Sequence, residues 1–253
     1  MRDPGAGDTE RVTCRMLRLT GIVTLLAVAA GQVAGQAPPP PYRVTWWDAA
    51  SVATAAGLAV IPAAADLPHG LPSCAPCDPA ALPGIDRVAL HTFSGPAATA
   101  STALLAGVVG FAGLASLDGA SAEQARGRAA VLANAVGWTF ATTEWVKVLT
   151  HRNRPVLYTA GAPAAASNPD NRRSFPSGHA SVAFAAATAY VVMAGRERLS
   201  HRARNAALLY AGAVGVAALR VAGGKHFPTD VAGGAALGGV IGWLVPTIHA
   251  RVP

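Results

Sequence analysis

Residues 174–194 read SFPSGHASVAFAAATAYVVMA and contain the two features that organise this chain. The run from Ala180 to Ala194 is apolar and does not alternate with a period of two, which predicts a helix rather than a strand. Pro and Ser suit the start of a helix, and Gly178 allows backbone N–H groups to approach an anion closely. The stretch therefore predicts a helix whose N-terminus binds an anion.

Apolar segments of similar composition occupy much of the remaining chain. Ala, Val, Leu and Gly fill them, short polar turns separate them, and none alternates with a period of two for long. This pattern predicts an all-α fold, a bundle of about six helices. The segments are roughly 49–65, 95–117, 129–148, 180–195, 206–219 and 231–248.

The composition points toward a membrane. Hydrophobic residues make up 52% of the 253 residues, charged residues make up 13%, and the mean hydropathy is +0.35. A soluble domain usually has about a quarter of its residues charged, and a helix needs about 20 apolar residues to cross a bilayer. We therefore expect a bundle that is embedded in a membrane in part. A soluble helical bundle with the same apolar core is the alternative.

The positive charges bear on partners and on orientation. The net charge is +7, but no basic stripe interleaved with aromatic residues appears, so no nucleic-acid partner is expected. Four arginines between segments 180–195 and 206–219 place that loop in the cytoplasm by the positive-inside tendency, which leaves His179 facing outward. Segment 49–65 is expected to lie on the surface or to pack peripherally, because a full crossing after a cleaved signal would invert this orientation. The four arginines are Arg196, Arg198, Arg202 and Arg204.

The N-terminal part of the chain divides into two regions. Residues 1–36 place three arginines before an apolar stretch from Leu19 to Val33, as a signal peptide or an uncleaved N-terminal anchor does. Residues 37–93 are expected to form an extracytoplasmic segment that starts with a stiff proline-rich linker at Pro39–Pro41. Residues 94–253 are then expected to form a helical catalytic domain.

Cys74 and Cys77 form a single C-x-x-C in a stretch rich in Pro and Gly. In an oxidising compartment a local disulfide is the first interpretation, and a redox-active dithiol or unpaired thiols are the alternatives. A zinc site is disfavoured because a closed site takes four ligands and the sequence has no second pair of cysteines.

Lys147 and the dipeptide Arg154-Pro155 form the first of three polar clusters. A spacing of seven residues places Lys147 and Arg154 on nearly one face if the helix persists, so both can converge on one anion. A guanidinium binds two phosphate oxygens at once, whereas an ammonium acts as a compact point charge. An ordinary basic helix end is the alternative.

The second cluster is Pro176-Ser177-Gly178-His179, at the start of the helix quoted above. His179 falls in the first turn, where it can give a proton to a leaving oxygen, while Ser177 and Gly178 face the same anion. The alternative is that Ser177 only caps the helix and His179 is a satisfied polar residue.

The third cluster consists of Arg220, His226 and Asp230. Asp230 follows His226 by four residues, so it can accept a hydrogen bond from one imidazole nitrogen and leave the other as a lone pair aimed at phosphorus. A buried structural His–Asp pair is the alternative.

Together the three clusters resemble the type 2 phosphatidic acid phosphatase (PAP2) and haloperoxidase superfamily. Its signature is K-x6-R-P, then P-S-G-H, then S-R-x5-H-x3-D, and the chain follows it over residues 147–230. Leu219 occupies the place of the serine before the arginine. This departure implies the loss of one auxiliary hydrogen bond and not of the mechanism.

The resemblance implies a role for each matching residue. His226 would be the nucleophile that becomes phosphohistidine, Asp230 would keep its tautomer, and His179 would protonate the departing alcohol and then activate water. Cations already neutralise the phosphate, so no metal or other cofactor is expected. The groups that clamp the phosphate oxygens would be Lys147, Arg154, Arg220, Ser177 and the amide of Gly178.

We therefore expect a metal-independent phosphatase in the cell membrane, with an extracytoplasmic active site that hydrolyses a phosphomonoester or pyrophosphate on a lipid. A soluble periplasmic acid phosphatase acting on small phosphoesters is the first alternative, and a vanadate-dependent haloperoxidase is the second. The remaining histidines are expected to be surface or packing residues, and among them His151 is the first candidate for a contact with substrate. Arg172 and Arg173 are expected to be solvated loop residues, and contact with a second phosphate or a lipid headgroup is the alternative.

Overall fold

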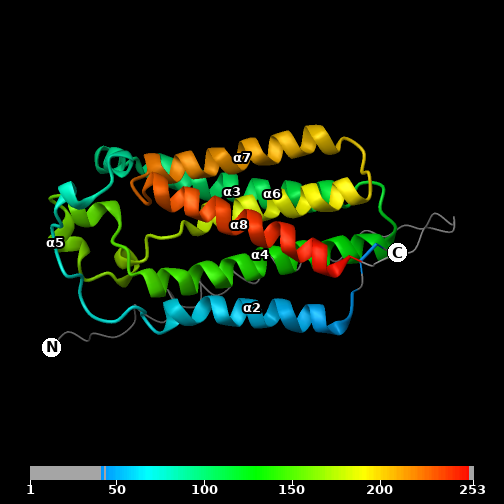
Figure 1. The fold of residues 1–253 in the computed structure, drawn as a ribbon, viewed down its shortest axis with the longest axis horizontal. Coiled ribbons are helices and arrows are strands. Elements are labelled where there is room, and N and C mark those ends of the chain that lie inside the picture. The colour runs from blue at the N-terminus through cyan, green and yellow to red at the C-terminus, as the bar shows by residue number, and fades with distance from the viewer. Residues whose placement is uncertain (1–40, 43, 251–253) are drawn as a thin grey trace, which may run out of the picture. The chain divides into compact units, whose positions relative to one another are not determined.

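The computed structural model describes residues 41–42 and 44–250, and these fold as helices and connecting loops without a β-strand (Figure 1). The prediction of an all-α fold is therefore confirmed. The predicted signal or anchor segment, residues 1–36, lies outside the described residues, as does most of the proline-rich linker.

Six long helices form the bundle, as the six apolar segments predict, and they lie side by side (Figure 1). A short helix, α5 (Ala162–Ala165), and four 3₁₀ turns lie in the loops: η2 (Pro79–Ala81), η3 (Gly84–His91), η4 (Pro155–Tyr158) and η5 (Pro169–Arg172). The long helices are α2 (Trp46–Ala64), α3 (Gly95–Ser116), α4 (Ala122–Thr150), α6 (Gly178–Arg196), α7 (Arg202–Ala222) and α8 (Pro228–His249).

Helix α6 lies at the centre and packs against α3, α4, α7 and α8. Its contact with α8 is close because α8 presents glycines at every fourth position, so they share one face of that helix. A Cβ at any of these glycines would clash with the α6 backbone. The small residues therefore fix how the start of α8 sits against the start of α6. The three glycines are Gly234, Gly238 and Gly242.

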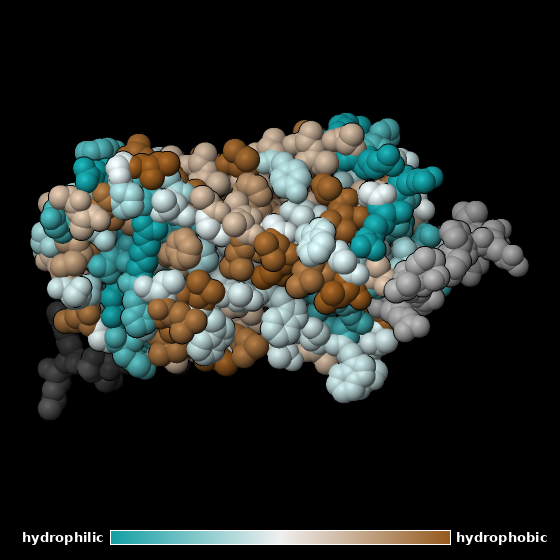
Figure 2. All heavy atoms as spheres, viewed as in Figure 1, coloured by the Kyte–Doolittle hydropathy of each residue, from teal (hydrophilic) through white to brown (hydrophobic). Residues whose placement is uncertain are grey.

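Five of the six long helices are long and apolar enough to cross a membrane, namely all except α4. Large apolar side chains also cover the outside of the bundle: Leu114 is 70% exposed, Val240 61% and Trp243 54%. Figure 2 shows apolar residues over the middle of the visible face and polar residues gathered towards its two ends. The protein is thus all-α and partly embedded in a membrane, because water would not accommodate such a surface well.

The two ends of the bundle differ in chemistry. Arg196 at the end of α6 bonds to Thr247 near the end of α8 (3.5 Å), and the arginine-rich turn 196–204 lies at this end. The starts of α6 and α8 lie at the other end, together with both catalytic candidates His179 and His226. Since an α-helix rises about 1.5 Å per residue, roughly 26 Å of helix separates His179 from Arg196, close to the thickness of a hydrocarbon core.

Helix α2 departs in part from what we expected of segment 49–65. It does pack peripherally, against α4, but it runs the full length of the bundle. Its first turn meets the arginine-rich end, where Asp48 lies 3.0 Å from His249, and its last turn reaches the histidine end, where Ala63 lines the pocket described below. A crossing by α2 that starts at the arginine-rich end therefore keeps the predicted orientation where the chain before α2 lies in the cytoplasm, and not where α2 follows a cleaved signal.

Candidate active site

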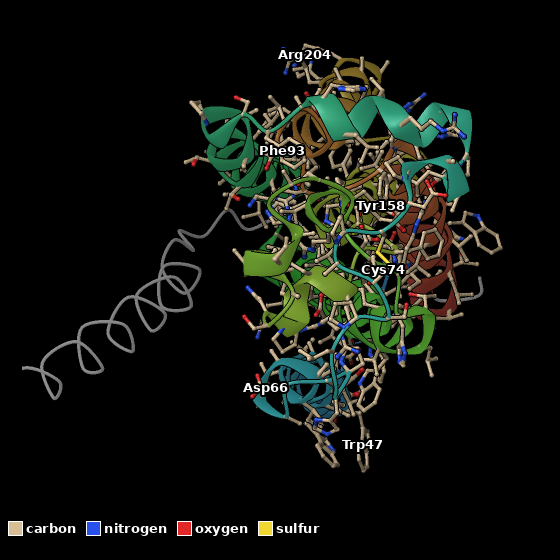
Figure 3. The ribbon with its side chains drawn as sticks, turned by 90° about the vertical axis from the view of Figure 1, so that its left-hand side faces the viewer. Trp47, Asp66, Cys74, Phe93, Tyr158 and Arg204 are labelled. Atoms are coloured by element: carbon tan, nitrogen blue, oxygen red, sulfur yellow. A yellow bond between two sulfur atoms is a disulfide. The ribbon has the colours of Figure 1, made fainter. Side chains whose placement is uncertain are left out.

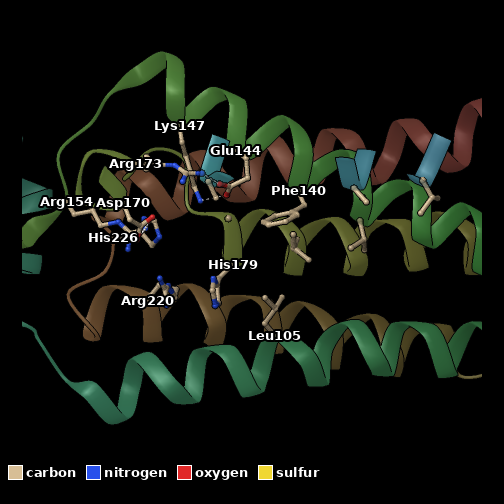
Figure 4. Close-up of a pocket in the computed structure, with 17 residues that line it drawn as sticks. Leu105, Phe140, Glu144, Lys147, Arg154, Asp170, Arg173, His179, Arg220 and His226 are labelled. Atoms are coloured by element: carbon tan, nitrogen blue, oxygen red, sulfur yellow. Dashed lines mark hydrogen bonds and ion pairs between the residues drawn. The ribbon is translucent and has the colours of Figure 1, made fainter. Parts of the chain in front are cut away.

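One pocket of about 650 Å³ brings the three polar clusters together (Figure 4). It lies at the histidine end and takes residues from α2, α3, α4, α6, α7 and the loops between them. Ser177 and Asp230 are not among the residues of its wall, and the Ser177 amide donates a hydrogen bond to the Asp230 carbonyl (3.0 Å). The sequence-predicted residues in the wall are Lys147, Arg154, Gly178, His179, Arg220 and His226.

His226 lies in the short connection between α7 and α8, with an exposed fraction of 1%. Its Nδ1 is 2.8 Å from the backbone carbonyl oxygen of Ser174, which can only accept a hydrogen bond. The proton therefore belongs on Nδ1, and Nε2 carries the lone pair. Burial lowers the pKa of His226 from 6.5 to about 3, against the opposing influence of the nearby Asp230 carboxylate. The imidazole is therefore neutral near pH 7, as a nucleophile must be.

Asp230 supports His226 by a different contact from the one we expected. Its carboxylate lies 3.6 Å from His226 Nδ1, farther than the Ser174 carbonyl. The carboxylate instead accepts hydrogen bonds from the Ser174 hydroxyl (2.5 Å), the Phe227 amide (2.9 Å) and Arg152 Nη1 (2.5 Å). Asp230 thus holds the loop that orients His226, and its charge lies close enough to stabilise a positive imidazole.

His179 and Arg220 both contact helix α3, which the signature does not include. His179 Nε2 is 3.0 Å from the Thr102 hydroxyl, and Arg220 Nη1 donates to the Ser101 hydroxyl (3.4 Å). In Figure 4 the two residues lie next to each other and face the His226 region of the pocket. Neither Ser101 nor Thr102 carries a sequence signal, because both sit in an apolar run of small residues.

The cations of the pocket are partly balanced by two carboxylates. Glu144 accepts hydrogen bonds from Lys147 (2.5 Å) and from Arg173, and Asp170 pairs with Arg154 (2.9 Å). Arg173 is 6% exposed and lines the pocket, so the expectation that it is a solvated loop residue is wrong. The other two cations of the wall are Lys147 and Arg220, so four cations face two carboxylates and leave an excess of two positive charges.

Several buried donors of the site have no hydrogen-bond partner within the described chain. They are the Nε atoms of Arg154, Arg173 and Arg220, together with the Ser177 hydroxyl. Ser177 precedes the first turn of α6, but its side chain makes no capping hydrogen bond, so a capping role does not account for it. Unsatisfied buried donors are costly, and an anion with several oxygens is the ligand that would satisfy the three arginines, which all line the pocket.

The pocket has a polar part and an apolar part. The polar part reaches solvent at Asp170, whose side chain is 51% exposed. The apolar part runs away from the charged residues between the helices, and it reaches the outer surface of the bundle at Phe140, which is 43% exposed (Figure 4). The other side chains of the apolar part include Leu105, Val136 and Val182.

The segment before α3 packs against the histidine end (Figure 3). Cys74 and Cys77 form a disulfide with an S–S distance of 1.99 Å, and Asn153, the neighbour of Arg154, donates a hydrogen bond to Cys77 Sγ (3.2 Å). Arg172 is also buried and bonds to the carbonyl of Pro68, so the expectation of a solvated residue is wrong here too.

His151 ends α4 in the left-handed conformation (φ 49°), is exposed, and is not among the residues of the pocket wall. The contact with substrate that we expected of it therefore has no support in the geometry. Within the described residues, no three His, Cys, Asp or Glu side chains gather as they would around a metal ion.

A comparison of the chain with known protein families agrees with the grouping of the three polar clusters. The model of the PAP2 superfamily matches residues 128–252, a range that contains all three polar clusters. This region belongs to the PAP2 superfamily. Members of the PAP2 superfamily are phosphatases, so the protein is, at that level, a hydrolase of phosphate esters. No curated protein and no solved structure matches the chain. Helices α2 and α3 and the disulfide precede the matched PAP2 region.

Proposed function

We propose that this protein is a metal-independent phosphatase that hydrolyses a phosphomonoester or pyrophosphate on a lipid through a phosphohistidine at His226. The observation that carries the proposal is the set of unpartnered buried donors around a pocket that also holds a neutral histidine. The excess of two positive charges in the pocket wall equals the charge of a phosphate monoester dianion. An anion of that charge would satisfy both the donors and the charge balance.

In the first step, Nε2 of His226 attacks phosphorus as the bond from phosphorus to the ester oxygen breaks. His179 gives its proton to the departing oxygen, so the alcohol leaves neutral. The imidazole of His226 becomes positive, and the Asp230 carboxylate at 3.6 Å from Nδ1 stabilises that charge. The arginines and Lys147 hold the oxygens on which negative charge builds up.

In the second step, water hydrolyses the phosphohistidine. The now neutral His179 takes a proton from the water as the water oxygen bonds to phosphorus and the bond from phosphorus to Nε2 breaks. Inorganic phosphate leaves, His226 is again neutral with its proton on Nδ1, and His179 is again protonated. No redox change or added reagent is needed.

The lipid part of the proposal rests on the apolar part of the pocket. It starts beside the charged residues and opens at Phe140 on the outer face of a bundle that lies partly in the membrane. A hydrocarbon chain attached to the phosphate would follow this path, because its transfer from water or bilayer into an apolar channel leaves no polar group unsatisfied. A small soluble phosphoester would leave that part of the pocket unused.

The experiment is phosphate release by the purified full-length chain in detergent, in the presence of EDTA. The substrates are phosphatidate, undecaprenyl diphosphate, phosphatidylglycerophosphate and p-nitrophenyl phosphate. We expect release from at least one lipid and none from the His226→Ala variant, and trapping of acid-labile phosphate on wild-type protein only. Wild-type rates in His226→Ala would exclude the mechanism. Hydrolysis of p-nitrophenyl phosphate alone would support the broad-specificity alternative.

A further inference from the structure

A buried aspartate from outside the PAP2 region contacts the start of helix α8. Asp86 lies in η3, and its exposed fraction is 0%. Its carboxylate accepts hydrogen bonds from the Thr229 amide (3.0 Å), the Thr229 hydroxyl (2.7 Å) and Arg152 Nη2 (2.7 Å). The Thr229 amide is one of the first-turn donors that a helix cannot satisfy internally, so Asp86 caps α8 from another element.

Arg152 joins this aspartate to the active site. Its Nη2 bonds to Asp86, while its Nη1 bonds to Asp230 (2.5 Å) and to the Thr229 hydroxyl (2.7 Å). The guanidinium also lies over the Phe227 ring, 4.7 Å from the centroid. One planar cation therefore pairs with two carboxylates that are each fully buried, and the guanidinium fork directs one Nη atom to each of them.

The network continues to the nucleophile. The Asp230 carboxylate accepts a hydrogen bond from the Ser174 hydroxyl, and the Ser174 carbonyl accepts one from Nδ1–H of His226. The Ser174 amide in turn donates to the Arg152 carbonyl (2.9 Å), so the backbone of Arg152 also fixes Ser174. Each link determines where the next can lie, and the last one determines which nitrogen of His226 carries the lone pair.

We propose that Asp86 and Arg152 are positioning residues that hold the Asp230–Ser174–His226 unit in its reactive geometry. This inference rests on the proposed function of His226 and adds residues that the signature does not contain. Asp86 precedes the PAP2 match by 42 positions, and Arg152 stands in the unspecified spacer between Lys147 and Arg154. Neither residue lines the pocket, so they act through the loop and not on the substrate.

The alternative is that the pair only stabilises the fold. The two roles differ in which kinetic constant they affect. Two of the phosphate-binding cations are held by carboxylates outside this network: Lys147 by Glu144 and Arg154 by Asp170. Loss of the network should therefore leave substrate binding intact. Misplacement of an attacking atom by about 1 Å can cost about 100-fold in rate.

The test compares Asp86→Asn, Arg152→Gln and Arg152→Lys with the wild type. We expect kcat for the best lipid substrate to fall roughly 10- to 100-fold in Arg152→Gln, with KM and inhibition by inorganic phosphate changed less than about threefold. Arg152→Lys should not restore kcat, because a single ammonium nitrogen on a shorter side chain lacks the rigid fork that directs one nitrogen to each carboxylate. The double variant Asp86→Asn/Arg152→Gln should be no slower than Arg152→Gln alone, because both changes break one network.

Arg87→Gln is the matched control. Arg87 is the neighbour of Asp86 in η3 and bonds only to backbone carbonyls of the same segment, those of Leu82 and Ala80. It should retain the wild-type kcat. If Asp86→Asn and Arg152→Gln both retain kcat within twofold of Arg87→Gln, the positioning role is wrong. It is equally wrong if their activity falls only in proportion to the folded fraction.

A spectroscopic measurement separates this inference from the proposed function. In ¹⁵N-histidine spectra of the solubilised protein, the His226 signal is the one absent from His226→Ala. We expect the Nδ1–H tautomer in the wild type and a mixture of tautomers in Arg152→Gln. If His226→Ala remains fully active, the proposed function fails while the spectra still decide the positioning role. An unchanged tautomer in Arg152→Gln would overturn that role.

Discussion

Two adjacent buried arginines, Arg172 and Arg173, have different roles in the structure. Arg172 and Arg173 follow one another, both are buried, and the Nε of each has no partner within the described chain. Arg172 bonds to the carbonyl of Pro68, however, whereas Arg173 lines the phosphate pocket. The sequence placed both in a polar loop and could not separate them, because the distinction depends on which neighbours the tertiary fold brings to each.

We predict that Arg173→Gln raises the KM for a phosphate ester about tenfold, which corresponds to about 1.4 kcal/mol of binding. The physical reason is that the variant removes one of the two excess positive charges. Steady-state kinetics with p-nitrophenyl phosphate or the best lipid substrate measure the change.

Arg172→Gln serves as the comparison, because it removes an equally buried arginine from the adjacent position. It should lower thermal stability with little change in KM. Equal KM values for the two variants would contradict the assignment of Arg173 to the phosphate pocket.

At the scale of elements, the contact between α6 and α8 sets the distance between the two helix starts at which His179 and His226 lie. Gly238 of α8 faces the backbone of α6, where an added Cβ would clash with Ser181. Gly239, its neighbour, has open space at the same atom. Gly238 therefore has a packing reason, and Gly239 does not.

We predict that Gly238→Ala destabilises the protein by about 1–3 kcal/mol, because overpacking a tight contact forces the helices apart. Activity should fall with stability, since α8 begins at the third polar cluster. Gly239→Ala should instead stabilise slightly, by up to about 1 kcal/mol, because alanine has the higher helix propensity. Thermal unfolding in detergent and phosphate release measure both; a neutral Gly238→Ala would show that the two helices can separate without cost.

The helices were largely predictable from the sequence, and the reasons are local. Each long helix coincides with an apolar run, and Ser94, Ser121 and Pro228 mark helix starts by capping or by a suitable first-turn residue. The three polar clusters fall at helix ends, which is why order and spacing alone grouped them. Asp86, Arg152 and Thr102 could not be found this way, because each becomes functional only through a contact with a distant segment.

At the scale of the whole molecule, the arginine-rich turn and the pocket lie at opposite ends of the bundle. By the positive-inside tendency, we expect the arginine-rich end in the cytoplasm and the histidine end outside it. Helix α2 then starts on the cytoplasmic side, a consequence that the sequence could not supply because the direction of α2 relative to α4 is a tertiary property.

We predict that a membrane-impermeant maleimide labels Ala81→Cys but not Ser200→Cys in intact cells, in a Cys14→Ser background. Both positions are exposed, Ala81 at the histidine end and Ser200 in the arginine-rich turn. Cys74 and Cys77 are paired and should not react.

Permeabilised cells provide the control, since both variants should then be labelled. The reverse pattern in intact cells would place the active site in the cytoplasm. The protein should also stay in the pellet after carbonate extraction, as its five apolar helices require.

The pocket opens to water at Asp170 and to the bundle surface at Phe140. With the proposed lipid substrate, the two products of hydrolysis would have separate exits: inorganic phosphate would diffuse into the aqueous phase, and the lipid alcohol would enter the bilayer laterally. Release of one product would then not depend on release of the other. Phosphate in the aqueous phase should inhibit turnover, whereas alcohol already dissolved in the bilayer should have little effect.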